Sequence, residues 1–75
     1  MTQVTELTKH GFQRLSQRSG IRTRQHAHKF LKHVISNGKK HLHGEFDKCV
    51  YKYNGCSYVF REDKNKLVLI TMFVN

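Results

Sequence analysis

Three side chains suited to phosphate chemistry recur at four-residue intervals near the start of the sequence. His10, Arg14 and Arg18 would share one face of a helix, because residues four apart on an α-helix are neighbours. Two guanidinium groups on such a face could hold a phosphate through paired hydrogen bonds, and an imidazole can move a proton near neutral pH. The simpler interpretation is a solvated helix edge whose arginine stems cover the core.

Cleavage of RNA without a metal needs a base near the 2′-hydroxyl, an acid for the leaving oxygen and cations around the phosphorane. His10 and a tyrosine, with Tyr51 as first candidate, could transfer the protons, and Arg14 and Arg61 could supply the charge. Tyrosines in strands are more often packing residues, so the sequence leaves enzymatic activity undecided. If the tyrosines are exposed instead, they would stack on unpaired bases, which favours single-stranded RNA or DNA.

Metal and thiol chemistry receive little support. The segment His41-x-His43 would place two imidazoles on one side of an extended chain, but no carboxylate or thiolate at a defined spacing completes a ligand set. Cys49 and Cys56 have no neighbouring histidine in sequence that would activate a thiol. The sequence therefore predicts no metal or other cofactor, and two reduced cysteines packed in strands.

Charge is the strongest signal of the whole chain. Its 75 residues include 14 Lys+Arg against 5 Asp+Glu, a formal net charge of +9, and nine of these bases precede Glu45. Such an excess favours a polyanionic partner. The residues predicted to contact nucleic acid are Arg14, Arg18, Arg22, Arg24, Lys29, Lys32, Lys39, Lys40, Lys48, Lys52 and Arg61.

Length and hydropathy restrict the class of protein. A chain of 75 residues, 37% hydrophobic and with mean hydropathy −0.65, is expected to fold in water as one domain, 1–75. The longest apolar run, 67–70, is far shorter than the ~18 residues of a membrane span, and no signal peptide pattern is present. We expect a cytoplasmic protein without a membrane partner.

The first of two predicted helices runs from about residue 8 to 18. Thr8 is a suitable N-cap, and Gly20 is placed to end the helix in the left-handed conformation. Gly11 inside this helix costs roughly 1 kcal/mol relative to alanine. This suggests that another segment packs closely there.

The second predicted helix follows Thr23 as N-cap and runs to about Asn37. Its apolar residues recur with helical spacing and would form one complete buried stripe: Ala27, Phe30, Leu31, Val34 and Ile35.

The remaining sequence predicts strands. Asn54-Gly55 is a favoured two-residue turn between strands at 48–53 and 56–62. The resulting register pairs Cys49 with Phe60, Tyr51 with Tyr58 and Tyr53 with Cys56 on one face, and Lys48 with Arg61, Val50 with Val59 and Lys52 with Ser57 on the other. We expect the aromatic face to pack on the helices and the basic face to meet solvent or ligand.

The last predicted strand, 66–74, is apolar on both of its faces. Such a strand is either central in its sheet or covered by a partner, for example a second copy in a homodimer. A short edge strand could form around 41–43. The predicted fold class is α+β, with two N-terminal helices packed on a C-terminal three-stranded antiparallel sheet, extended by that edge strand if it forms.

This arrangement resembles small phage- and prophage-type proteins that share the outline of the RelE-type toxin superfamily. The resemblance lies in His10-x3-Arg14-x3-Arg18, Gly20-Ile21, the hairpin YKYNGCSYVF and the strand KLVLITMFV, and it spans about 8–74. RelE-type toxins cut messenger RNA, usually on the ribosome, with basic and tyrosine side chains on a sheet and no metal. The resemblance implies a toxin-like, metal-free ribonuclease whose cations are Lys48, Lys52 and Arg61.

Two classes of function therefore stay open. The first is a small basic RNA-binding domain, with or without cleavage. The second is a phage or mobile-element protein without enzymatic activity that binds an acidic surface of a host protein.

Overall fold

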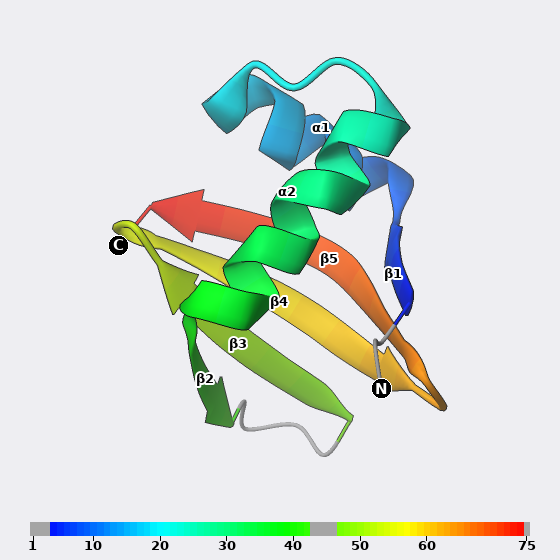
Figure 1. The fold of residues 1–75 in the computed structure, drawn as a ribbon, viewed down its shortest axis with the longest axis vertical. Helices are drawn as coiled ribbons and strands as arrows, with labels where there is room; N and C mark the ends of the chain where they lie inside the picture. Colours follow the sequence, from blue (N-terminus) through cyan, green and yellow to red (C-terminus); the bar gives the residue numbers. More distant parts are fainter. Residues whose placement is uncertain (1–3, 43–46, 75) are drawn as a thin grey trace.

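In the computed structural model, which describes residues 4–42 and 47–74, helix α2 lies across one face of a five-stranded sheet and α1 packs against β5 (Figure 1). The spatial order of the strands is β1-β5-β4-β3-β2, in which β1 runs parallel to β5 and every other neighbouring pair is antiparallel. The predicted α+β class is confirmed. In chain order the elements are β1 (Val4–Leu7), α1 (Lys9–Ser19), α2 (Arg24–Asn37), β2 (Lys39–Leu42), β3 (Lys48–Tyr53), β4 (Cys56–Asp63) and β5 (Lys66–Val74).

The predicted three-stranded antiparallel sheet is wrong, because the sheet has five strands and is mixed. Strand β1 precedes both helices and was not predicted. Its apolar signal is weak, since Thr5 is one of its two buried residues and Glu6 one of its two exposed ones. Strand β2 forms where the optional edge strand was expected, and it begins two residues earlier than 41.

Strand β5 is central over its first half, which explains why it is apolar on both faces. Strand β1 flanks it on one side at Lys66–Leu69, and β4 flanks it on the other side. Of the two explanations offered by the sequence, a central position accounts for this half without any partner.

The predicted helix ends are confirmed to within one residue, since α1 spans Lys9–Ser19 and α2 spans Arg24–Asn37. The Thr8 hydroxyl accepts a hydrogen bond from the Gly11 amide at 2.9 Å, and the Thr23 hydroxyl accepts one from the His26 amide at 3.2 Å. Gly20 has φ 76° and ends α1 in the left-handed region. Gly38 is the C-cap of α2; its backbone is extended at φ −82°, and its amide donates to the Val34 carbonyl.

The close approach predicted at Gly11 is confirmed and fixes the position of α1. A Cβ atom placed on Gly11 would lie 2.3 Å from the carbonyl oxygen of Leu69 in β5. The Thr8 hydroxyl donates to the same carbonyl at 3.1 Å. The first turn of α1 therefore sits directly against the backbone of β5.

The register of the β3–β4 hairpin is confirmed at all six predicted pairs. Asn54 and Gly55 both have positive φ, 51° and 81°, as a type I′ turn requires. Because side chains alternate along a strand, this register puts Tyr51 and Tyr58 on the helix side and Lys52 on the opposite side.

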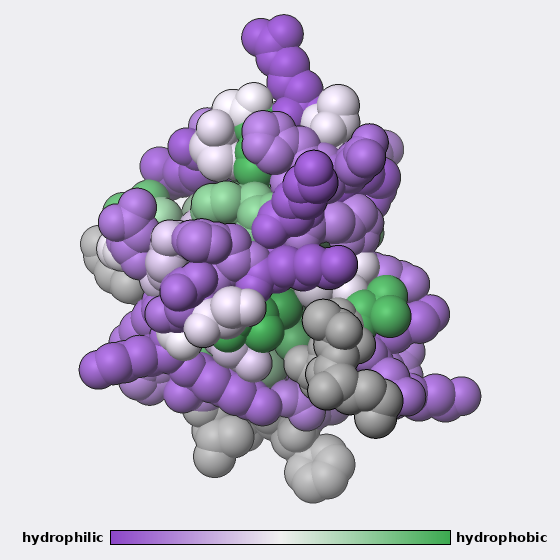
Figure 2. Space-filling view, viewed as in Figure 1, coloured by the Kyte–Doolittle hydropathy of each residue, from purple (hydrophilic) through white to green (hydrophobic). Residues whose placement is uncertain are grey.

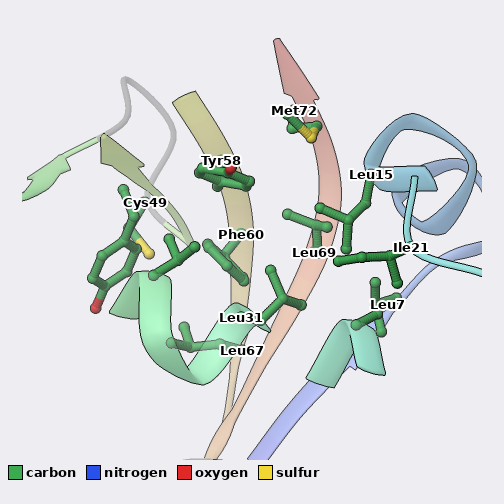
Figure 3. Close-up of a cluster of buried hydrophobic side chains, with 13 residues drawn as sticks. Leu7, Leu15, Ile21, Leu31, Cys49, Tyr58, Phe60, Leu67, Leu69 and Met72 are labelled. Carbon is green, nitrogen blue, oxygen red and sulfur yellow. The ribbon is translucent and has the colours of Figure 1, made fainter. Parts of the chain in front are cut away.

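The core lies between the helices and the aromatic side of the sheet (Figure 3). The core includes residues of both helices and of β4 and β5 that have no exposed surface: Leu15, Leu31, Phe60 and Leu69. The rings of Tyr51 and Phe60 meet edge to face with centroids 5.5 Å apart. The predicted packing of the aromatic hairpin face on the helices is confirmed.

Candidate nucleic-acid interface

Positive charge is concentrated on the exposed side of α1, α2 and the loop between them. Hydrophilic side chains cover most of the face that the helices present (Figure 2). Residues 8–38 contain no aspartate or glutamate, and every lysine and arginine among them is exposed. We call the seven the helix-layer cations: Lys9, Arg14, Arg18, Arg22, Arg24, Lys29 and Lys32.

The carboxylates that the structure describes do not neutralise this layer. Ion pairs within residues 4–42 and 47–74 join Lys40 to Glu62 at 3.0 Å and Lys66 to Glu6 at 3.1 Å. Neither pair includes a helix-layer cation, so these seven charges face solvent without an acidic neighbour in that part of the chain.

Arg24, a helix-layer cation, also has a structural contact. Its guanidinium donates to the Leu7 carbonyl at 3.3 Å and lies 5.1 Å from the centre of the Phe12 ring. A cation over an aromatic ring at this distance is weakly attracted to it. Arg24 therefore links the start of α2 to β1 and α1 while its side chain stays on the surface.

A second set of cations lies on the helix-free side of the sheet. Cross-strand neighbours are Lys39 with Lys52 and Lys48 with Arg61, so β2, β3 and β4 all contribute. We call these four the sheet-face cations. Helix α2 covers the other side of the sheet (Figure 1). On the basic hairpin face Lys52 and Arg61 are exposed, as predicted, whereas Ser57 and Val59 are buried there.

Lys40 belongs to neither set. Strand alternation puts it on the helix side of β2, where its ammonium pairs with the Glu62 carboxylate. The hydrogen bond to Glu62 raises the pKa of Lys40, and the same bond lowers the pKa of Glu62. Lys40 was grouped with the nucleic-acid contacts because sequence does not reveal this partner.

The four residues predicted to act in cleavage are not brought together. His10 Nε2 lies 3.3 Å from the Thr71 hydroxyl beside β5, and Arg14 is exposed on α1. Tyr51 is 7% exposed on the helix side of the sheet, whereas Arg61 projects from the helix-free side. No common site holds these four groups around one phosphate.

The hairpin tyrosines behave as packing residues rather than as stacking platforms. Tyr51 and Tyr58 are 7% and 4% exposed, and Tyr53 is half-buried against Phe30 and His33. Burial raises the pKa of Tyr51, and it raises the pKa of Tyr58 to about 12. Neither buried hydroxyl is suited to proton transfer near neutral pH.

Histidines and cysteines form no cluster in the described part of the chain. No three His, Cys, Asp or Glu side chains within residues 4–42 and 47–74 are placed to hold a metal ion. His41 lies on β2, and His43 is outside the described residues. Both cysteines are free thiols, and burial raises the pKa of Cys49 to about 11.

Two surface residues were not singled out from sequence. Lys9 adds a cation to the first turn of α1 and was recognised only as part of the total charge. Phe73 is 50% exposed near the end of β5, in register with Ser57 on the helix-free side. Its place in an apolar strand gave no sign of exposure.

The geometry of these surfaces is the basis for any functional conclusion. Comparison of the chain with protein-family models, with curated proteins and with solved structures gave no match. Neither helix, in the part of the chain that the structure describes, is long and apolar enough to cross a membrane.

Proposed function

We propose that this protein is a nucleic-acid-binding domain whose principal contact surface is formed by the helix-layer cations. One observation carries this function: seven exposed lysines and arginines occupy a segment of 31 residues, 8–38, that has no acidic residue. RNA is the favoured partner on the RelE-type resemblance. Tyr51 is buried on the helix side of the sheet and Arg61 projects from the helix-free side, and this separation supports binding rather than cleavage.

Counterion release gives the expected strength of this interaction. For a single strand, each phosphate neutralised contributes about 0.7 to the slope of log affinity against log salt. If all seven helix-layer cations contact phosphates, the slope approaches about −5. Affinity would then fall by roughly 10³ between 50 and 200 mM salt.

The test is a fluorescence-anisotropy titration of a labelled RNA oligonucleotide, and of DNA of the same sequence, over a series of salt concentrations. The informative variant is K29Q/K32Q, which removes two exposed cations from α2. Loss of two phosphate contacts should weaken binding about 25-fold at 0.1 M salt and reduce the slope by about 1.4.

A matched control separates local contact from total charge. The variant K64Q/K66Q loses the same two charges near the turn between β4 and β5, away from the helix layer. It should bind RNA nearly as the parent does. Equal weakening in both variants, or no binding to RNA or DNA at 25 mM salt, would overturn the proposed function.

An acidic host protein is the alternative partner for the same charge. Pull-down from a bacterial lysate, with and without nuclease treatment, separates the two. An association carried by RNA disappears after treatment. An association that survives, and that K29Q/K32Q abolishes, would replace RNA by an acidic protein as the partner.

A further inference from the structure

The sheet-face cations lie on the side of the sheet opposite to α2. The α2 cations Lys29 and Lys32 are separated from the sheet-face cations by the core and the sheet (Figures 1 and 3). Helix α1 instead reaches toward the helix-free side, because His10 Nε2 lies 3.3 Å from the hydroxyl of Thr71, the register partner of Val59. The protein measures 30 × 26 × 22 Å, and Figure 1 is viewed along the shortest of these axes, with α2 in front of the sheet. A polyanion bound to the exposed side of α2 therefore does not cover the sheet-face cations.

We infer that the protein bridges two nucleic-acid segments, one held by the α2 cations of the helix layer and a second, single-stranded segment held by the sheet-face cations Lys39 and Lys52. This bivalent role rests on the proposed function and adds a second binding surface to it.

Electrostatics permits both faces to be occupied at once. The Debye length at physiological ionic strength is about 8 Å. Two phosphate backbones on opposite faces are separated by a body 22 Å thick, which is more than twice that length. Their mutual repulsion is thus largely screened, whereas each backbone lies directly against its own cations.

The sheet face is positive toward one end. Lys39 and Lys52 are cross-strand neighbours about 5 Å apart, as adjacent strands are. The described acids on this face, Glu6 and Asp63, lie toward the opposite end, where Lys66 pairs with Glu6 and is the cross-strand neighbour of Asp63. A phosphate chain is therefore attracted to the end of the sheet face that carries Lys39 and Lys52.

An exposed aromatic ring at the same end favours unpaired nucleotides. Across the sheet, the row that begins with Lys39 and Lys52 continues through Ser57 to Phe73. Phe73 is 50% exposed, and two strand spacings place it about 10 Å from Lys52. An aromatic side chain beside cations can stack an unpaired base, a contact that the bases of an intact duplex do not offer.

A second copy of the protein fits this face less well than a polyanion. If two copies paired through it about a twofold axis, the same basic patch would contribute to both sides of the contact. Lys39, Lys52 and Arg61 would then be buried against like charges. Nucleic acid has the complementary charge.

The test is a capture assay. A biotinylated single-stranded RNA is immobilised on beads, protein is added below saturation, and retention of a second, fluorescent single-stranded RNA is measured at 0.1 M salt. The parent protein should retain the second RNA. Unlabelled RNA in large excess should release it, because each face then binds a separate competitor.

Paired variants assign the second surface. K39Q/K52Q should keep binding the immobilised RNA through the helix layer and should lose capture about 25-fold, the expected effect of two phosphate contacts at this salt. K64Q/K66Q removes the same number of charges and should capture as the parent does. Phe73→Ala should weaken capture more than Val74→Ala, since Val74 is equally exposed at 51% but projects to the helix side.

The outcomes distinguish this inference from the proposed function. Failure to bind the immobilised RNA at all would reject the proposed function. Binding at one RNA per protein without retention of a second RNA would reject bridging alone. Capture that K39Q/K52Q leaves intact would also reject it, because a dimer of singly bound proteins would then explain the result.

Discussion

The contact between α1 and β5 predicts that Gly11→Ala lowers the stability of the protein, the opposite of the usual effect of this substitution in a helix. Replacing glycine by alanine inside a helix ordinarily stabilises a protein by up to about 1 kcal/mol. Gly11→Ala should do the reverse, because the new Cβ would lie 2.3 Å from the Leu69 carbonyl oxygen and 3.0 Å from its carbonyl carbon. Ordinary contacts of a Cβ atom begin near 3.4 Å. The helix must therefore move away from the strand by roughly 1 Å.

The magnitude follows from what that movement disturbs. Overpacking a close contact costs about 1–3 kcal/mol. The shift also strains the hydrogen bond from the Thr8 hydroxyl to the Leu69 carbonyl, which is worth about 1 kcal/mol. After the gain in helix propensity is subtracted, we expect a net destabilisation of about 1–3 kcal/mol. For a domain of this size, each 1 kcal/mol lowers Tm by about 4–8 °C.

Urea denaturation and thermal melting followed by circular dichroism measure this change. The matched control is Gln13→Ala in the same helix, where the side chain is exposed and no close contact is lost. That substitution should alter stability by less than about 0.5 kcal/mol. A Gly11→Ala protein as stable as the parent, or more stable, would show that α1 does not rest on β5 as described.

Three further predictions concern titration, thiol reactivity and capping. Burial raises the pKa of Cys49 from 9.0 to about 11 and that of Tyr58 from 10.0 to about 12, so the unfolded state loses these protons at lower pH than the folded state does. The free energy of unfolding should therefore fall as pH rises from about 9 to 12, by up to about 1.4 kcal/mol per pH unit for each group. Urea titrations at pH 7, 9, 10 and 11 measure this fall; Cys49→Ala should reduce it at the lower pH values, and an unchanged stability over the range would contradict the prediction. Cys49 is 1% exposed and should react with a thiol reagent far more slowly than the half-buried Cys56. Peptide mapping after labelling at pH 8 measures the two rates. Preferential labelling of Cys49 would be inconsistent with its burial. Thr8→Ala should destabilise the protein by about 1 kcal/mol in the same denaturation assay, because it removes the capping hydroxyl. Thr8→Ser keeps that hydroxyl and should retain most of the stability. Equal losses in the two variants would show that the destabilisation does not come from loss of the cap.

Local signals made the hairpin and the helices predictable. Asn54-Gly55 admits the positive φ angles of a type I′ turn, and that turn fixes every pair between β3 and β4. Thr8 and Gly20 mark the two ends of α1 through chemistry that lies within a few residues of each end. Features of this kind need no knowledge of distant contacts.

Strand β1 was missed because its stability comes from distant partners. Thr5 is 4% exposed although it is polar, and its hydroxyl lies 3.0 Å from His28 Nδ1 on α2. The backbone of β1 is paired with a segment more than 60 residues later in the chain. The four residues of β1 reveal neither the contact with His28 nor the pairing with β5. Only the apolar residues on both faces of β5 indicated that this strand has an additional neighbour.

The candidate interface was predictable in composition but not in arrangement. Sequence identifies the acid-free segment 8–38, and exposure of its cations follows from their charge. Which side of the sheet each of the remaining lysines and arginines occupies depends on the alternation of side chains along a strand and on the pairing of the strands. This places Lys52 on the helix-free side, whereas Lys40 lies on the helix side with Glu62.

The parallel pairing of β1 with β5 also has a consequence for the order of folding during synthesis. Val4 is matched with Lys66, so the sheet cannot be completed until more than 60 residues have been made and have left the ribosome. The hairpin of β3 and β4 is local and can form earlier. While β5 is still inside the exit tunnel, β1 and α1 lack the strand against which they pack. Chaperones can bind their exposed apolar side chains on the nascent chain during that interval.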